Sequence, residues 1–382
     1  MGSITSAIKE AARNLGFEVV GITGVAPFPD GLEALNHWRE AGMASGMEYM
    51  TRKPELKANP GMLVPSAASL ISLAVNHYTP EPAFKHQNRY GRIARYAWGR
   101  DYHDVIRPRL IELSREISSI ATGQAEENAE LSSRSFVDAV PLLERAVANR
   151  AGLGFFGKNT NLILPRAGSW YFLAEIFVSL KLPEDQNERR VSCGSCHKCL
   201  DVCPTEAFSG PYKLDANKCI SYLTIENKGP IPRDLRSGLG EWLFGCDLCQ
   251  EVCPFNRFSS SNCWPDLKPE AGPGQKLDLV DLLSIRTDSE YRARFQGTAL
   301  MRPKRKGMLR NAAVVAANIG CDAALCGLTD LAEYDPEPLI RSHSMWAAFQ
   351  LSGPKALPIL ERLLKDPDQS VRAEAQAVID GA

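Results

Sequence analysis

Eight of the eleven cysteines of this 382-residue chain fall in one stretch, and their spacing can bind iron–sulfur clusters. The first four follow the pattern C-x2-C-x2-C-x3-C-P, by which bacterial ferredoxins hold such clusters: Cys193, Cys196, Cys199 and Cys203. The second run keeps a C-x2-C-x3-C-P ending and has a lone cysteine upstream: Cys219, Cys246, Cys249 and Cys253. Two zinc sites are the alternative, but these usually join two C-x2-C pairs across a longer spacer. The two C-x3-C-P endings therefore favour two 4Fe–4S clusters.

The cysteine order also predicts which residues bind which cluster. In two-cluster ferredoxins the fourth cysteine of a run binds the other cluster. Cluster one is then bound by Cys193, Cys196, Cys199 and Cys253, and by symmetry cluster two is bound by Cys203, Cys219, Cys246 and Cys249. Cysteines at this spacing predict a reducing compartment rather than disulfides.

Composition predicts an ordinary globular protein. Hydrophobic residues make up 44% and charged residues 23% of the chain, and its length suits two or three domains. The net charge of −1 excludes a generically basic nucleic-acid binder, but it allows a local basic groove. The first residues do not resemble a signal peptide, and no apolar run could span a bilayer. We therefore expect a cytoplasmic protein without a membrane partner.

The residues before the cysteines predict helices and strands in one domain. Apolar residues repeat at helical spacing up to Leu15, and Gly16 is placed to end that helix. Strands are expected at residues 17–22, 70–75 and 170–180. We predict an α/β (α+β) domain over residues 1–185, followed by a ferredoxin-like domain over residues 186–265.

A strand-to-helix turn is predicted around Asp138. Pro141 fits the first helical position and Gly152 the helix end. Such turns often bind ligands, although an aspartate there can simply bond nearby amides, and the pattern alone leaves both roles open. A further helix is predicted from Arg107, with Pro108 in its first turn.

Aromatic side chains alternate with lysines and arginines between residues 85 and 109: Tyr90, Tyr96, Trp98 and Tyr102. Aromatic rings can stack on a ligand while arginine pairs with phosphate, so a phosphate-rich ligand and a solvated loop are both open. Asp101 and His103 begin a D-x-H-x-x-G motif, by which some proteins give cobalamin a histidine ligand. Because Ile106 replaces the glycine, we interpret this match as coincidental.

Three helices rich in small residues begin with an arginine at intervals of 31: Arg310, Arg341 and Arg372. The later two follow Asp-Pro turns, which predicts a HEAT-like α-helical repeat domain over residues 266–382. Cys321 and Cys326 are expected in its core. The repeat opens with five cations, which favour either an RNA partner or a solvated capping helix: Arg302, Lys304, Arg305, Lys306 and Arg310.

Together these stretches resemble the epoxyqueuosine reductase family, iron–sulfur and cobalamin enzymes that complete queuosine in tRNA. The resemblance covers nearly the whole chain, including the helical tail. It is carried by both cysteine runs and by residues 95–103, 137–145, 152–160, 168–170 and 219–226. It implies an oxidoreductase that reduces epoxyqueuosine to queuosine in the anticodon loop of tRNA, the last step of queuosine biosynthesis.

The resemblance also implies the roles of individual residues. Asp138 would be the proton donor, and cob(I)alamin would receive its electrons through the two clusters. The implied cobalamin contacts are Lys57, Tyr96, Asp101, Tyr102, Lys158, Asn159, Thr160, Ser221, Asp247 and Leu248. The implied tRNA contacts are Thr224, Ile225, Glu226, Lys228, Arg302, Lys304, Arg305 and Lys306.

The function that the resemblance implies also sets the expected partners, and two other functions remain open. We expect an external low-potential electron donor and a monomer. The chain could instead be a reductive dehalogenase-like cobalamin and iron–sulfur enzyme, which tRNA binding would exclude. It could also be a cobalamin-free ferredoxin-type electron-transfer protein, which a cobalamin absorbance band in reconstituted protein would exclude.

Overall fold

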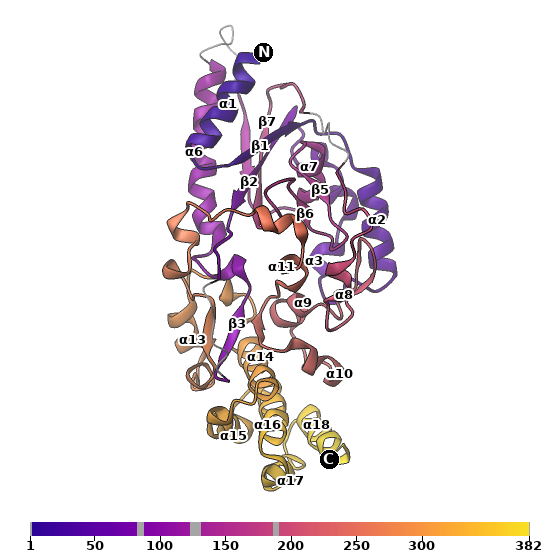
Figure 1. The fold of residues 1–382 in the computed structure, drawn as a ribbon, viewed down its shortest axis with the longest axis vertical. Coiled ribbons are helices and arrows are strands. Elements are labelled where there is room, and N and C mark those ends of the chain that lie inside the picture. The colour runs from indigo at the N-terminus through magenta and orange to yellow at the C-terminus, as the bar shows by residue number, and fades with distance from the viewer. Residues whose placement is uncertain (1, 82–87, 123–130, 186–190, 382) are drawn as a thin grey trace. The chain divides into compact units, whose positions relative to one another are not determined.

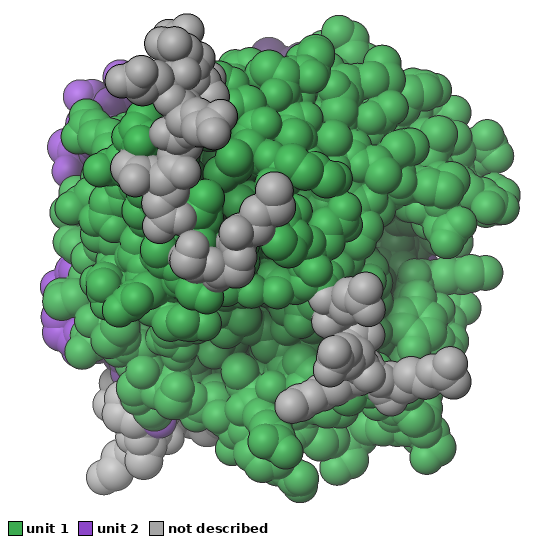
Figure 2. All heavy atoms as spheres, turned by 90° about the horizontal axis from the view of Figure 1, so that it is seen from above, with its two compact units in different colours: residues 1–80, 100–216, 248–268 green, residues 81–99, 217–247, 269–382 purple. Residues whose placement is uncertain are grey.

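The computed structural model of the protein describes residues 2–81, 88–122, 131–185 and 191–381, and the chain forms two compact units (Figures 1 and 2). Unit 1 comprises residues 1–80, 100–216 and 248–268, and unit 2 comprises residues 81–99, 217–247 and 269–382. Each unit is thus assembled from segments that are far apart in the sequence. The domain boundaries expected near residues 185 and 265 fall inside unit 1, so the three-domain division stays a prediction.

Unit 1 is built around a four-stranded sheet with the order β1-β2-β7-β4. Its strands are β1 (Val19–Thr23), β2 (Ser69–Asn76), β4 (Ser133–Phe136) and β7 (Tyr171–Val178). The two central strands, β2 and β7, are paired along their whole length. All neighbouring strands are antiparallel, which makes this an α+β arrangement.

Helices cover both faces of this sheet (Figure 1). On one face α1 (Gly2–Asn14) lies beside α6 (Tyr102–Thr122), and α7 (Glu144–Arg150) covers the other. Because strand side chains alternate between faces, Leu70 and Phe177 reach Val147 of α7 in one apolar cluster. The expected helix end at Gly16 is confirmed by its φ of +90°.

Smaller elements complete unit 1. They are α2 (Pro29–Glu40), α3 (Glu48–Thr51), α4 (Pro54–Lys57), α5 (Pro60–Leu63), β5 (Phe155–Phe156), β6 (Leu162–Ile163), α8 (Lys198–Asp201), β8 (Phe208–Gly210), β9 (Lys213–Leu214) and α11 (Leu248–Glu251). Two helix starts were predicted wrongly. The helix expected from Arg107 begins at Tyr102, because the Asp101 side chain accepts the amide of His103 as an N-cap would. The helix expected from Pro141 begins at Glu144.

Unit 2 joins a small three-stranded sheet to a stack of helices. The sheet has the order β10-β3-β11: β3 (Tyr90–Ile93), β10 (Trp242–Phe244) and β11 (Lys276–Asp278). The helices are α9 (Ile220–Ile225), α10 (Arg233–Arg236), α12 (Leu279–Leu282), α13 (Asp288–Phe295), α14 (Lys304–Asn318), α15 (Leu325–Tyr334), α16 (Pro338–Ser352), α17 (Leu357–Leu363) and α18 (Gln369–Asp380). Along the stack α14 packs on α16, and α16 packs on α18.

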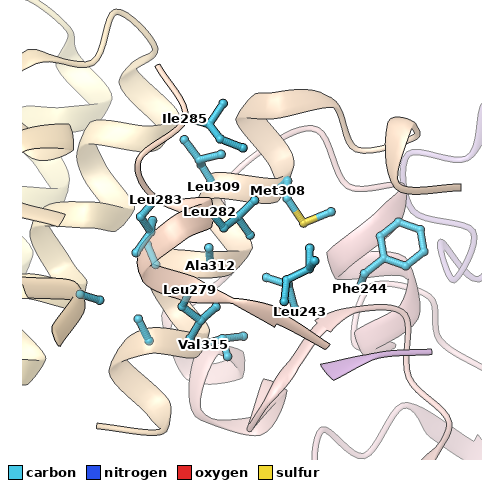
Figure 3. Packing of buried hydrophobic residues seen from close by; sticks show 14 of the residues in the cluster. Leu243, Phe244, Leu279, Leu282, Leu283, Ile285, Met308, Leu309, Ala312 and Val315 are labelled. Atoms are coloured by element: carbon cyan, nitrogen blue, oxygen red, sulfur yellow. The ribbon is translucent and has the colours of Figure 1, made fainter. Parts of the chain in front are cut away.

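The apolar core of unit 2 connects its sheet to the first repeat helix (Figure 3). Leu243 and Phe244 of β10 pack in one cluster with Met308 and Leu309 of α14. Cys321 is buried in this core as predicted, but the prediction was wrong for Cys326, which is exposed. Across the described ranges, no helix combines the length and apolar character that a membrane span requires.

Candidate active site and cluster-binding cysteines

Four cysteine sulfurs gather in unit 1 in the grouping predicted for cluster one. Burial, followed by the sulfurs of Cys193 and Cys253, raises the pKa of Cys199 to about 11. Burial also raises the pKa of Cys253, and the sulfurs of Cys193 and Cys196 add to this effect. The fold therefore brings Cys253 to the first three cysteines of the first run, although it lies in the second run.

The side chain of Lys158 is hydrogen-bonded to the loop that carries these cysteines. Its ammonium group donates to the carbonyls of Gly194 at 2.7 Å and Cys196 at 2.9 Å. Its amide also lies 3.4 Å from the sulfur of Cys193. Lys158 was predicted as a cobalamin contact, but these bonds commit its side chain to the cysteine loop.

The other four cysteines are divided between the two units. In unit 1 the sulfur of Cys203 accepts the amide of Ala207 at 3.4 Å, and the carbonyl of Cys249 accepts Asn159 at 3.3 Å. In unit 2 Cys219 stands at the N-terminus of α9, and Cys246 follows β10 and Gly245. Within the described part of the chain, no three His, Cys, Asp or Glu side chains converge as they would on a single metal ion.

Asp138 lies on the loop between β4 and α7, as predicted. Its φ is +45°, in the left-handed region that costs most L-residues roughly 1–2 kcal/mol. Its amide donates to Oε1 of Glu144 at 3.0 Å, and the hydroxyl of Tyr102 donates to its Oδ2 at 2.6 Å. The carboxyl stays accessible, since 64% of the side chain is exposed. Strain held in place by such bonds is a feature of functional loops.

A histidine at the start of α6 faces the same carboxyl. Nε2 of His103 lies 3.9 Å from Oδ2 of Asp138, while its Nδ1 lies 2.8 Å from Oδ1 of Asp101. The bond to Asp101 raises the pKa of His103, although burial opposes this. Burial also works against ionisation of Asp101, but its bonds with His103 outweigh that cost and lower its pKa. The motif that we interpreted as coincidental thus places His103 beside Asp138.

Three further ionisable groups surround this loop. Lys57 is buried, and its burial lowers its pKa against the attraction of Asp138 and Glu144. Burial and the charge of Asp138 raise the pKa of Glu144 to about 8. Glu175 of β7 is fully buried, and neither carboxyl oxygen has a hydrogen-bond partner among the residues that the structure describes. Burial, then Glu144 and Asp138, raise the pKa of Glu175.

The predicted cobalamin contacts fall into two groups. The side chains of five are buried or bonded inside their own unit: Lys57, Asp101, Lys158, Asn159 and Asp247. Asp247, for example, accepts the amide of Arg95 at 2.8 Å within unit 2. The other five keep part of their surface exposed: Tyr96, Tyr102, Thr160, Ser221 and Leu248.

The basic and aromatic segment has a structural role in the part that the structure describes; residues 85–87 lie outside it. Arg92 pairs with Glu81 at 2.9 Å, and Arg89 pairs with Asp278 at 2.5 Å. Trp98 is buried and donates its indole N–H to the carbonyl of Ile93. These pairings favour the structural interpretation of the segment over a phosphate site.

Three of the predicted tRNA contacts have buried side chains. Thr224 is fully buried, and Ile225 belongs to the core of unit 2. Arg305 is also buried, because it pairs with Asp335 and donates to the carbonyl of Ile285. None of the three offers a side chain to a ligand at the surface.

The remaining predicted contacts do lie at the surface of unit 2. Arg302 donates twice to Glu226, at 2.8 and 3.1 Å, and Lys228 donates to the carbonyl of Arg302 at 3.4 Å. Lys304 is exposed and Lys306 half-buried. We call Lys228, Arg302, Lys304 and Lys306 the basic cluster.

Two acids next to Asp138 were not predicted as functional residues: Glu144 and Glu175. Glu175 had a sequence signal, since it is a lone acid in the apolar strand 171–178. Glu144 gave none, although the residue that it binds, Asp138, lies only six positions away in the sequence.

Comparisons with known proteins match three segments of the chain to known families. Residues 192–256 match a family described as a 4Fe-4S double cluster binding domain, residues 57–139 match epoxyqueuosine reductase QueG, and residues 299–380 match HEAT repeats. The epoxyqueuosine reductase of Pseudomonas aeruginosa is 39% identical over 357 residues, which cover 90% of this chain and 93% of that protein.

Solved structures agree with this match over nearly the full length. A crystal structure of epoxyqueuosine reductase with a tRNA-Tyr epoxyqueuosine-modified stem loop has a TM-score of 0.89 and 32% identity, covering 99% of this chain and 98% of that one. The Bacillus subtilis enzyme, in a structure whose aspartate-bearing catalytic loop is swung out of the active site, has a TM-score of 0.88 at 32% identity, with 99% and 98% covered. The predicted iron–sulfur and HEAT-like segments are confirmed, and the chain belongs to the epoxyqueuosine reductase family.

Proposed function

We propose that this protein reduces epoxyqueuosine to queuosine in tRNA, with Asp138 as the proton donor. The observation that carries the assignment of Asp138 is its geometry: an exposed carboxyl on a backbone with positive φ, held by the hydroxyl of Tyr102. A relative from Bacillus subtilis is described with a catalytic aspartate loop that can leave the active site. Asp138 likewise lies on a loop, between β4 and α7.

The reaction determines which redox groups are needed. Conversion of an epoxide to an alkene and water consumes two electrons and two protons. Iron–sulfur clusters transfer electrons singly, so the two clusters form a relay from an external donor. Cluster one uses Cys193, Cys196, Cys199 and Cys253, and cluster two uses Cys203, Cys219, Cys246 and Cys249. Cobalamin, when bound, supplies a reduced cobalt centre that collects both electrons.

The exposed predicted contacts suit the chemistry of a corrin, which combines a broad apolar ring with amide side chains. Tyr96, Thr160 and Ser221 offer hydroxyl groups, and Tyr102, whose hydroxyl is bonded to Asp138, and Leu248 offer aromatic and apolar surface. These five residues would hold the cobalamin. The other five predicted contacts would affect cobalamin binding indirectly, by holding the segments to which they are bonded.

The residues around Asp138 supply the two protons. Asp138 gives the first proton to the oxygen that is released when the epoxide C–O bond breaks, as a general acid. Tyr102 holds the carboxyl in place for this transfer. His103, whose Nε2 is 3.9 Å from the same carboxyl oxygen, returns a proton to Asp138 for the second transfer, and the oxygen leaves as water. Asp101 keeps the His103 ring oriented.

The basic cluster would contact the tRNA, since ammonium and guanidinium groups pair with phosphate. Glu226 would act together with Arg302, whose guanidinium it binds. Because three buried residues are removed from the predicted set, the contacts now proposed are Glu226, Lys228, Arg302, Lys304 and Lys306. The external electron donor, the monomeric state and the cytoplasmic location stay predictions.

The test is a single-turnover assay under anaerobic conditions. Protein reconstituted with iron, sulfide and cobalamin is reduced and mixed with an anticodon stem-loop that carries epoxyqueuosine. We expect conversion to queuosine, detected by mass spectrometry as the loss of one oxygen, and cobalamin retained after gel filtration. Fully loaded and reduced protein that leaves the nucleoside unchanged would contradict the proposed reaction.

A further inference from the structure

The arginines that recur at intervals of 31 lie inside the repeat helices, which begin earlier than predicted, at Lys304, Pro338 and Gln369. In the later two repeats the arginine binds the turn before its helix. Arg341 donates to the carbonyls of Asp335 and Pro336, at 2.8 and 3.1 Å. Arg372 likewise donates to the carbonyls of Asp366 and Pro367, at 2.6 and 2.9 Å. In both cases the guanidinium binds the helix to the Asp-Pro turn that precedes it.

Arg310 occupies the same position in the first repeat but binds a different segment. Its guanidinium donates to the carbonyls of Leu223 at 2.6 Å, Asn227 at 2.8 Å and Gly229 at 2.6 Å. The residue is fully buried, and among the described residues it forms no ion pair with a carboxylate. Burial lowers its pKa to about 10. Residues 223–229 thus take the place that the Asp-Pro turn has in the later repeats.

Asn311 extends this contact to the neighbouring strand. Its amide donates to the carbonyl of Thr224 at 2.8 Å and to that of Leu243 at 3.0 Å, while its oxygen accepts Arg310. The hydroxyl of Thr224 in turn accepts the amide of Gly245 at 2.9 Å. Helix α14 is therefore hydrogen-bonded to both α9 and β10, in addition to the apolar packing shown in Figure 3.

Such a buried network has little freedom to move. A buried guanidinium must keep its acceptors, because a buried charge without hydrogen-bond partners is strongly unfavourable. The carbonyls of α9 and of the following loop are consequently held at fixed places relative to α14. Cys219 begins α9, and Cys246 directly follows Gly245. Both ends of the network thus lie next to a cysteine.

We propose that Arg310 and Asn311 are positioning residues for cluster two, which hold α9 and β10 so that Cys219 and Cys246 keep a fixed spacing. The first HEAT-like repeat would then position ligands of an iron–sulfur cluster, in addition to any contact with RNA. This inference rests on the proposed ligand set of cluster two.

The experiment compares Arg310→Lys and Thr224→Val with a matched control, Arg341→Lys. Lysine keeps the charge of Arg310, but one ammonium group cannot reach all three carbonyls. Valine removes the hydroxyl of Thr224 at nearly constant volume, and Thr224→Ser restores it. Arg341→Lys makes the same change one repeat later, where the partners are a turn and Asp366. Iron, sulfide, EPR spectra and reduction potentials are measured on each reconstituted variant, with Cys219→Ser and Cys253→Ser as references.

We expect Arg310→Lys and Thr224→Val to lose, or shift in potential, the signal that Cys219→Ser removes. The signal that Cys253→Ser removes should remain, and Thr224→Ser and Arg341→Lys should resemble the parent. Unchanged content and potentials in the first two variants would overturn the proposal, and so would an equal loss of both clusters, because that indicates general unfolding. If Cys219→Ser itself leaves both signals intact, the ligand set is wrong instead.

Discussion

The hydroxyl of Tyr102 donates a 2.6 Å hydrogen bond to Oδ2 of Asp138, and this bond joins the start of α6 to the loop between β4 and α7. The ring of Tyr102 is stacked between His103 and Phe172, with centroids 4.1 and 4.3 Å away. Because the stacking fixes the ring, the hydroxyl can hold the Asp138 carboxyl in place even though that side chain is exposed.

Asp138→Asn tests the role of the carboxyl as an acid. Asparagine tolerates the positive φ of this position and can still accept the bond from Tyr102, so the loop should keep its structure. It cannot release a proton, and general acid catalysis contributes about 10²–10⁴-fold, so single-turnover formation of queuosine should slow by that factor. Iron, sulfide and cobalamin content is measured on the same sample. A fully loaded variant within a few-fold of the parent rules out Asp138 as the donor.

Tyr102→Phe tests the positioning of that acid. The stacked ring remains, and only the hydrogen bond to Asp138 is removed. A hydrogen bond contributes about 0.5–1.5 kcal/mol, which corresponds to roughly 2- to 12-fold in rate. The single-turnover rate should fall by that factor. Tyr212→Phe, which removes an exposed hydroxyl elsewhere in unit 1, is the control and should match the parent. Equal rates for both variants would show that the bond has no part in the reaction.

The buried carboxyl of Glu175 predicts a pH-dependent stability. Burial raises its pKa above the ordinary 4.5, so the folded protein keeps a proton that the unfolded chain releases. The stabilising contribution of the protonated form is complete below pH 4.5 and is lost as the pH rises toward the folded pKa. Glu175→Gln stays neutral throughout. Its melting temperature should therefore exceed that of the parent at pH 8 by more than at pH 5.

The control for this comparison is Glu112→Gln, which removes an exposed carboxyl from α6. Its melting curve should follow the parent at both pH values. The prediction fails if the difference in melting temperature between Glu175→Gln and the parent is the same from pH 5 to pH 8. Glu175 would then be ionised in the folded protein, and its surroundings would offset the cost of burying its charge.

Cysteine substitutions test the crossed arrangement of cluster ligands. Cys253 lies near Cys193 and Cys196 in unit 1, so Cys253→Ser should damage cluster one. Cys219→Ser should damage cluster two. Each variant should lose about half of the iron and sulfide, with a different EPR signal missing. Cys326→Ser removes an exposed cysteine outside both runs and should leave both signals. Identical spectra from Cys253→Ser and Cys219→Ser would disprove the crossed assignment.

The features predicted best from the sequence depend on local chemistry. The cysteine runs are recognisable because ligand spacing follows from cluster geometry. The strand at β2 is a continuous apolar run, and the end of α1 is marked by Gly16. Asp138 was also placed correctly, because the turn between β4 and α7 has a clear pattern.

The features that were missed depend on contacts between distant residues. Arg305 and Lys304 are neighbours in a basic run, yet only Arg305 is buried, because Asp335 supplies its partner from the next repeat. Thr224 carries no sign in the sequence that its hydroxyl will accept the amide of Gly245. His103 was set aside because its motif lacked a glycine, and its proximity to Asp138 arises only from the packing of α6 in unit 1.

The basic cluster is expected to bind tRNA through phosphate contacts. Ending the chain just before Arg302 would remove α14, and with it Arg310, Asn311 and part of the unit 2 core. Such a truncation therefore cannot isolate RNA binding. Lys304→Gln with Lys306→Gln removes two charges and leaves the buried network intact. Affinity for full-length tRNA should fall, and the log–log salt slope should flatten by roughly 0.7–0.9 for each phosphate that the variant no longer neutralises.

The matched control is Lys365→Gln, which removes an exposed charge from the later repeats. It should change neither the affinity nor the slope. Because the double variant alters no proposed proton donor or cluster ligand, its single-turnover rate at saturating stem-loop should equal that of the parent. If the double variant binds tRNA with the parent's affinity and salt slope, Lys304 and Lys306 do not contact phosphate. The repeat would then act in this protein through its buried network, not through its charged surface.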